Sequence, residues 1–162
     1  MSIATQSFTT IVNAAFLQDV KEACVELWDT VHRLRHLTEE AHASAAAAKR
    51  LVEIVSELRD QLAFAFSLEE AYGFIDGCRG QSPVLAHRAQ IAKQQHRELY
   101  LLITELCEQA QEAQYRGFVD RDFPKLLVAA ADFDAQLQAH EQFESELIHH
   151  GWLSERASVN SH

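Results

Sequence analysis

His140 and Glu144 lie four residues apart in the stretch AHEQFESELIHHG, among apolar residues that recur with the period of a helix. Phe133, Leu137 and Leu147 define one stripe of that helix, and the imidazole and the carboxylate fall on the same stripe. Residues four apart share a helix face, so both polar groups are expected to point into the protein interior. A histidine and a glutamate enclosed together can bind a metal ion or pair with each other.

The same pattern recurs upstream, where His96 and Glu69 each replace an apolar residue on a helical stripe. His96 lies about 17 residues before the end of its predicted helix and His140 about 17 after the start of the next, which places both roughly 25 Å from the shared turn. For Glu69 the same count differs by several residues. We predict that four polar side chains from three helices meet in one interior region: Glu69, His96, His140 and Glu144.

Enclosing two carboxylates costs several kcal/mol per ion even after relaxation, so this cluster needs a compensating charge. A divalent metal supplies that charge, and two imidazoles with two carboxylates suit iron, manganese or zinc. A metal-free alternative also balances the charge, because two protonated histidines can pair with the two glutamates. We favour the metal, since buried unpaired charge is rare and four such groups converge, and we keep the ion-pair network as the alternative.

Four helical segments would position these residues, at about 10–37, 44–75, 82–113 and 122–151. Only five Gly and two Pro interrupt the chain, and Ala, Leu, Glu and Gln are abundant, which favours helix. Residues typical of helix N-caps stand at three of the starts: Ser44, Ser82 and Asp122. Gly77 and Gly80 are expected to end the second helix, and Gly151 to take the left-handed position after the fourth.

Helices of roughly 25 residues with short connections pack most simply as an antiparallel up-down-up-down four-helix bundle. A chain of 162 residues with an ordinary apolar fraction favours one domain around one core. We therefore predict an all-α fold with a single domain over 1–162, a core at about 13–151 and a loose C-terminal tail.

The acidic composition argues against several classes of partner. The formal charge is −10 and the pI is about 5.3, with no local Lys/Arg cluster, so no nucleic-acid partner is expected. No apolar stretch reaches about 18 residues and MSIATQSFTT lacks the features of a signal peptide, so we expect no membrane partner and a cytoplasmic location. Three scattered cysteines suit a reducing compartment. The oligomeric state is left open.

Over about residues 13–151, these motifs resemble the hemerythrin-like, or HHE cation-binding, domain family. HEQFE at 140–144 is similar to the fourth motif of that family, QHREL around His96 to the third, and FSLEE, with Glu69 and Glu70, to the end of the second. NAAFLQDVKEACVEL is similar to the first helix. The resemblance implies a four-helix bundle with a non-haem di-iron centre, and hence iron as the cofactor and a small ligand such as oxygen or nitric oxide as a partner.

The departures from the family pattern concern one of its two irons. Ala65 stands where the second helix of the family carries a histidine, and Cys24 where the first helix carries a ligand. The resemblance therefore implies a mononuclear metal site, or the relic of a dinuclear one, held by the four predicted residues.

Three further residues are possible participants: Cys24, Glu70 and Tyr100. The Cys24 thiolate could ligate a metal, although a small apolar residue on a helical stripe is the favoured interpretation. Glu70 is expected in solvent, with a role beside the metal as the alternative. Tyr100 could donate a hydrogen bond to a metal-bound ligand or lie at the bundle edge.

The leading functional hypothesis is a hemerythrin-like iron-binding protein for sensing, storage or small-ligand binding. The alternative is a metal-free helical interaction module that kept the fold and lost the metal chemistry. A weaker third hypothesis is a mono-iron oxidase or peroxidase, but no general acid or substrate pocket can be identified in the sequence, so a non-enzymatic role is preferred.

Overall fold

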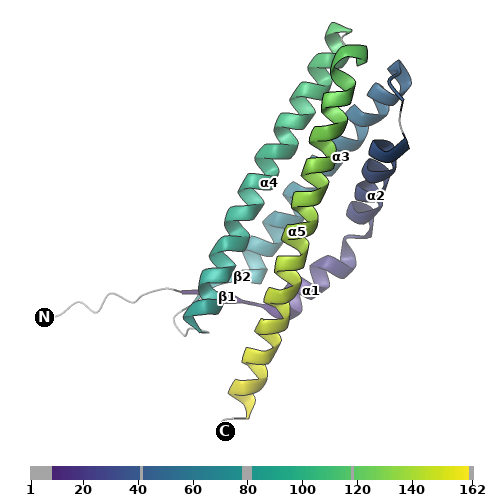
Figure 1. Ribbon diagram of the computed structural model, residues 1–162. Helices are drawn as coiled ribbons and strands as arrows, with labels where there is room; N and C mark the ends of the chain where they lie inside the picture. Colours follow the sequence, from purple (N-terminus) through teal and green to yellow (C-terminus); the bar gives the residue numbers. More distant parts are fainter. Residues whose placement is uncertain (1–8, 41, 78–81, 118, 161–162) are drawn as a thin grey trace, which may run out of the picture.

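The computed structural model describes residues 9–40, 42–77, 82–117 and 119–160, and most of them are helical (Figure 1). In chain order the elements are β1 (Thr9–Val12), α1 (Ala14–Ala23), α2 (Val25–Glu40), α3 (Ala45–Leu68), the π-helical turn η1 (Glu69–Gly73), β2 (Phe74–Gly77), α4 (Pro83–Arg116) and α5 (Val119–Val159). The predicted helical class is confirmed for this part of the chain, but the fold contains five α-helices and a short two-stranded ribbon.

Helices α2, α3, α4 and α5 pack side by side around an apolar core (Figure 1). α3 contacts α2 and α4, α4 contacts α5, and α5 contacts α2, so the four helices form a closed ring. Each contributes fully buried side chains, among them Leu34, Leu58, Ile103 and Leu137. Among the described residues, none of the helices combines the length and the apolarity needed to cross a membrane.

Local signals set several helix ends where the sequence predicts them. Ser44 caps α3, its hydroxyl accepting a hydrogen bond from the Ala47 amide at 3.0 Å. Ser82 caps α4, with Pro83 in the first helical position. Gly117, at φ 71°, closes α4 in the left-handed conformation that glycine adopts at no steric cost.

The predicted first helix, at about 10–37, is wrong in two respects. Residues 9–12 form β1, because the sequence TTIV consists of β-branched residues, which favour extended backbone. The remaining helix breaks at Cys24, whose backbone lies at φ −85° and ψ 47°. As a result α1 contacts α5 and η1, whereas α2 packs against α3 and α5.

The predicted second helix, to Ile75, also ends differently. The α-helix stops at Leu68 and widens into the π-helical turn η1, after which β2 pairs antiparallel with β1, Val12 opposite Phe74. A Cβ on Gly73 would lie 2.3 Å from Cδ2 of the fully buried Leu17, so a larger residue here would force that side chain to move. Gly77 belongs to β2 and does not end a helix, and Gly80 lies outside the described residues.

The fourth predicted helix is too short at both ends. α5 begins at Val119, so Asp122 lies in its first turn and is not its N-cap. The helix also continues through Gly151 to Val159. The predictions of a left-handed Gly151 and of a loose tail after it are therefore wrong. A Cβ on Gly151 would lie 3.0 Å from the Ala14 Cβ, so this glycine serves the close packing of α5 on the start of α1.

Candidate metal site

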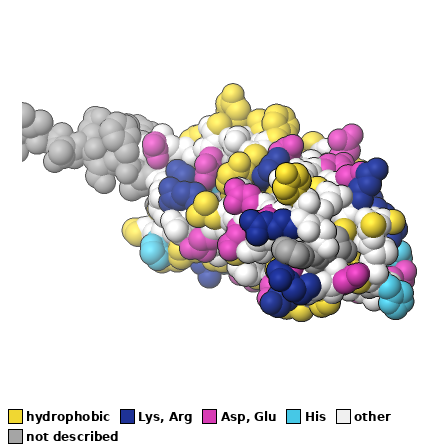
Figure 2. Space-filling view, turned by 90° about the horizontal axis from the view of Figure 1, so that it is seen from above, with side chains coloured by type: hydrophobic (Ala, Val, Ile, Leu, Met, Phe, Trp, Pro, Cys, Tyr) yellow, Lys and Arg dark blue, Asp and Glu magenta, His cyan; other side chains and the backbone are white. Residues whose placement is uncertain are grey.

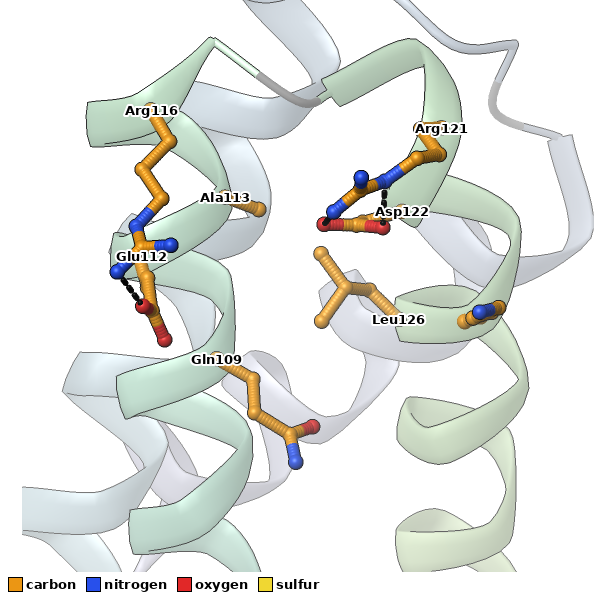
Figure 3. A pocket seen from close by; sticks show the side chains of 8 residues that line it. Gln109, Glu112, Ala113, Arg116, Arg121, Asp122 and Leu126 are labelled. Carbon is orange, nitrogen blue, oxygen red and sulfur yellow. Dashed lines mark hydrogen bonds and ion pairs between the residues drawn. The ribbon is translucent and has the colours of Figure 1, made fainter.

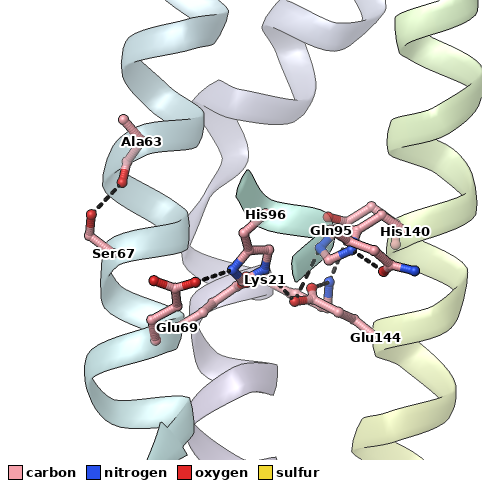
Figure 4. Close-up of polar contacts among 10 residues, drawn as sticks. Lys21, Ala63, Ser67, Glu69, Gln95, His96, His140 and Glu144 are labelled. Atoms are coloured by element: carbon pink, nitrogen blue, oxygen red, sulfur yellow. Dashed lines mark hydrogen bonds and ion pairs between the residues drawn. The ribbon is translucent and has the colours of Figure 1, made fainter. Parts of the chain in front are cut away.

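Four polar side chains converge inside the bundle, as the sequence predicts (Figure 4). Glu69 comes from η1, His96 from α4, and His140 and Glu144 from α5. One potential ligand atom from each lies within 4.8 Å of all the others, and none of the four residues is more than 4% exposed. Counting residues along the predicted helices placed Glu69 at a different level from His96. That count assumed a helix to Ile75, whereas the α-helix ends at Leu68 and the chain continues as η1 and β2.

The cluster forms a polar layer between two apolar cores. On α5, Leu137 belongs to the larger core and Leu147 to the smaller one, with His140 and Glu144 between them. On α4, His96 occupies the corresponding place. Apolar side chains therefore cover the layer on both sides, which keeps its charges in a medium of low polarity.

The His96 imidazole turns one nitrogen to the centre and the other to the outside. Its Nε2 lies 2.9 Å from Glu144 Oε1 and 3.0 Å from Glu69 Oε2. Its Nδ1 lies 3.3 Å from Glu70 Oε1. The ring also stacks on Phe66, with the centroids 4.0 Å apart. Glu70 and Phe66 thus fix the orientation that directs Nε2 to the two buried carboxylates.

The His140 imidazole is arranged in the same way. Its Nδ1 lies 2.7 Å from the amide oxygen of Gln95, to which a protonated Nδ1 donates. Its Nε2 faces the centre, 3.2 Å from Glu144 Oε1, without hydrogen-bond geometry. Among the described residues, this Nε2 and Glu69 Oε2 are two of the buried side-chain atoms without a hydrogen-bond partner. A bound metal would satisfy both, so the residues fit a metal ion.

Burial and mutual contact shift the pKa values of the cluster in opposite directions. Burial, together with the charge of Glu144, raises the pKa of Glu69 to about 8. Burial would lower the pKa of His96, but the surrounding carboxylates raise it to about 11. Burial would raise the pKa of Glu144, but its contacts with His140 and His96 hold it well below its usual range. Without a metal, protons on Glu69 and His96 thus compensate the enclosed charge at neutral pH.

Two residues that sequence reasoning missed complete the layer. The ammonium of Lys21, on α1, donates a hydrogen bond to Glu144 Oε2 at 2.9 Å (Figure 4). It donates another to Glu141. The Lys21 side chain is 15% exposed and that of Glu141 20% exposed. Burial would lower the pKa of Lys21, but the two carboxylates raise it. One feature of the sequence could have indicated that Lys21 points inward. It lies four residues after the buried Leu17 and so on the same helix face.

The three possible participants occupy different places. Glu70 contacts His96 Nδ1 on the side away from the cluster centre, and this hydrogen bond lowers the pKa of Glu70. Cys24 is half-buried beside the larger core and is not part of the four-residue group; burial, then the charges of nearby acids, raise the pKa of its thiol. Tyr100 is 41% exposed and lines a groove of about 380 Å³ together with Glu70 and His96. None of the three contributes to the four-residue group.

Another pocket, of about 330 Å³, lies beside the turn between α4 and α5 (Figure 3). Two ion pairs lie on its walls, Arg116 with Glu112 at 2.8 Å and Arg121 with Asp122 at 3.0 Å. The molecule seen from above likewise shows basic side chains interspersed with acidic ones (Figure 2). This pocket includes no member of the four-residue group, so the buried cluster is the better candidate for chemistry.

Comparisons of the chain with protein-family models, with curated proteins and with solved structures give no match. The likeness to hemerythrin-like domains therefore depends on the residues and motifs themselves.

Proposed function

We propose that the protein is a hemerythrin-like metal-binding bundle, with its helices in antiparallel up-down-up-down order. It binds one transition-metal ion, iron in the first place, through Glu69, His96, His140 and Glu144. The orientation of the two imidazoles is the observation that carries this proposal. Each directs Nε2 to the same centre, while an outer acceptor holds its Nδ1. Metal-binding histidines in proteins are typically held in this way.

The donor set supports a transition metal with room for a small ligand. Two imidazoles and two carboxylates suit iron, manganese or zinc. An iron ion held by four protein donors can bind a small ligand such as oxygen or nitric oxide, which suits sensing or storage. Glu70 and Gln95 would keep the imidazoles in place, and the groove beside His96 and Tyr100 would give a small molecule access.

Elemental analysis tests the proposal. The protein, purified without added metal and then loaded with Fe²⁺ under anaerobic conditions, should hold about one ion per chain. The double variant His96→Ala/His140→Ala should hold none. The matched control is His149→Ala/His150→Ala, which removes two exposed histidines from α5. Retention of the metal by the first variant, or its loss from the control, would contradict the assignment.

A metal-free interaction module is the second candidate, and the ion pairs favour it. Lys21 and His96 supply cations to Glu144, so the cluster is compensated without any metal. This candidate predicts that a chelator leaves the melting temperature of the purified protein unchanged. The metal-binding proposal predicts a decrease, because an ion at 100 times its Kd stabilises the fold by about 2.7 kcal/mol.

A further inference from the structure

The two oxygens of the Glu144 carboxylate serve different partners. Oε1 faces the imidazoles, at 2.9 Å from His96 Nε2 and 3.2 Å from His140 Nε2. Oε2 faces away from them and accepts a hydrogen bond from Lys21 Nζ at 2.9 Å. Glu144 thus connects the centre between the two imidazoles, where the metal is proposed, with the Lys21 ammonium.

The position of the ammonium is built by the fold. α1 carries Lys21 against α5, where Glu141 and Glu144 lie three residues apart and both contact Nζ. The ammonium is a compact point charge with three donors, so it can satisfy two carboxylates in the way that a metal ion would. Glu144 is fully buried, and its second oxygen has no contact with solvent to replace this partner.

We propose that Lys21 is an internal cation that takes the place of a second metal ion and so limits the site to one ion. This inference rests on the proposed metal site at Glu69, His96, His140 and Glu144. Lys21 is a specificity-determining residue in this account, because it contacts Glu144 and does not ligate the metal itself.

Removal of the ammonium should change the number of ions bound. Without it, the Glu141 and Glu144 carboxylates would face each other with no cation between them, and the shortened side chain would leave space there. These groups are suitable ligands for a divalent transition metal.

Equilibrium dialysis against Co²⁺ tests the inference through the number of ions per folded chain. Wild type should bind one ion and Lys21→Ala two. Lys21→Arg, which keeps the positive charge, should bind one. The double variant Lys21→Ala/Glu141→Gln should return to one, because it removes the carboxylate that a second ion needs. Lys49→Ala, at an exposed position, is the matched control for loss of a lysine and should bind one.

The outcomes separate this inference from the proposed function. One ion in both wild type and Lys21→Ala overturns the role of Lys21 alone. Two ions in wild type overturn it as well, because Lys21 would then not limit the site. No ion in wild type overturns the proposed function and the inference with it. If Lys21→Ala does not fold without metal, it is refolded with excess Co²⁺ and its ions are counted after gel filtration, where a count of one again overturns the inference.

Discussion

Binding of a divalent metal to the four-residue cluster should release about two protons near pH 7. His96 Nε2 donates a hydrogen bond to Glu144 Oε1 in the metal-free protein, and this proton must leave before the nitrogen can ligate a metal. Glu69 must lose its proton for the same reason. Glu144 contributes none, because its pKa lies well below the usual range and its carboxylate is already ionised.

The pKa values give the size and the sign of the effect. With a pKa of about 11, His96 is fully protonated at pH 7, and with a pKa of about 8, Glu69 is about 90% protonated, so the two release roughly 1.9 protons. Protons compete with the metal, so affinity falls as pH falls. Between pH 6 and 7 these two groups should change the Kd by roughly a hundredfold per pH unit, and above pH 8 by roughly tenfold, because Glu69 is then ionised.

Isothermal titration calorimetry with Zn²⁺ measures this count. Titrations at pH 7 in two buffers of different ionisation enthalpy give the number of protons released from the difference in observed enthalpy. The matched variant is Glu69→Gln, which has the shape of the protonated side chain and no proton to lose from a carboxyl. It should release about one proton. A wild type that releases none, or equal counts in the two proteins, would refute the assignment of these residues as ligands.

Three further outcomes follow from other contacts. Gln95→Leu removes the acceptor that orients the α5 imidazole and should weaken Zn²⁺ binding by roughly 10- to 100-fold in a chelator competition, whereas unchanged affinity would remove Gln95 from the site. Gly73→Ala places a Cβ against Leu17 and should lower the free energy of unfolding by about 1–3 kcal/mol in urea denaturation, and no loss would contradict this close approach. Asp134→Asn breaks the paired 2.9 Å hydrogen bonds from the partly exposed Arg35 and should cost about 1 kcal/mol at pH 7. The Asp134 pKa is lowered, so this stabilisation is present above the ordinary Asp pKa and is lost as pH falls through the folded value; a difference between wild type and variant that persists at low pH would contradict it.

Helical periodicity was sufficient to predict most of the candidate site. His96, His140 and Glu144 lie on stripes of apolar residues within long uninterrupted helices, where the spacing alone fixes the face of each residue. The stripes of α4 and α5 could therefore be assigned before their packing was known. Because both helices border the same core, convergence of these three side chains followed directly.

Lys21 and Glu141 could not be predicted in the same way. Their contact joins residues 120 positions apart, and neither residue type marks a buried site, because lysine can extend its charged end to solvent from an apolar stripe. The break at Cys24 separates α1 from α2, and α1 packs on α5, where the Lys21 ammonium contacts two carboxylates. No Gly or Pro marks this break in the sequence, so local signals could not predict it.

The β1–β2 ribbon and the π-helical turn were also beyond local reasoning. Ile75 continues the apolar period of α3, so the sequence alone favours helix there. Pairing with residues 9–12 supplies the backbone hydrogen bonds that make strand preferable, and this partner lies more than 60 positions away. The π-helical turn η1, between α3 and β2, begins at Glu69, so the element that sequence reasoning missed is the one that presents this candidate ligand.

In both candidate states the same net charge is carried by five groups of the enclosed layer, those of Lys21, Glu69, His96, Glu141 and Glu144. Without metal, Lys21 and protonated His96 carry two positive charges, and the Glu141 and Glu144 carboxylates carry two negative ones, with Glu69 neutral. With a divalent metal, the ion and the ammonium carry three positive charges and the three glutamates carry three negative ones. For these five groups both sums are zero, so the metal takes over the charge of the protons that it displaces. A fold that persists without metal is therefore what the metal-binding proposal expects. Proton release on metal addition, together with the lower melting temperature after chelation, separates this proposal from a metal-free interaction module.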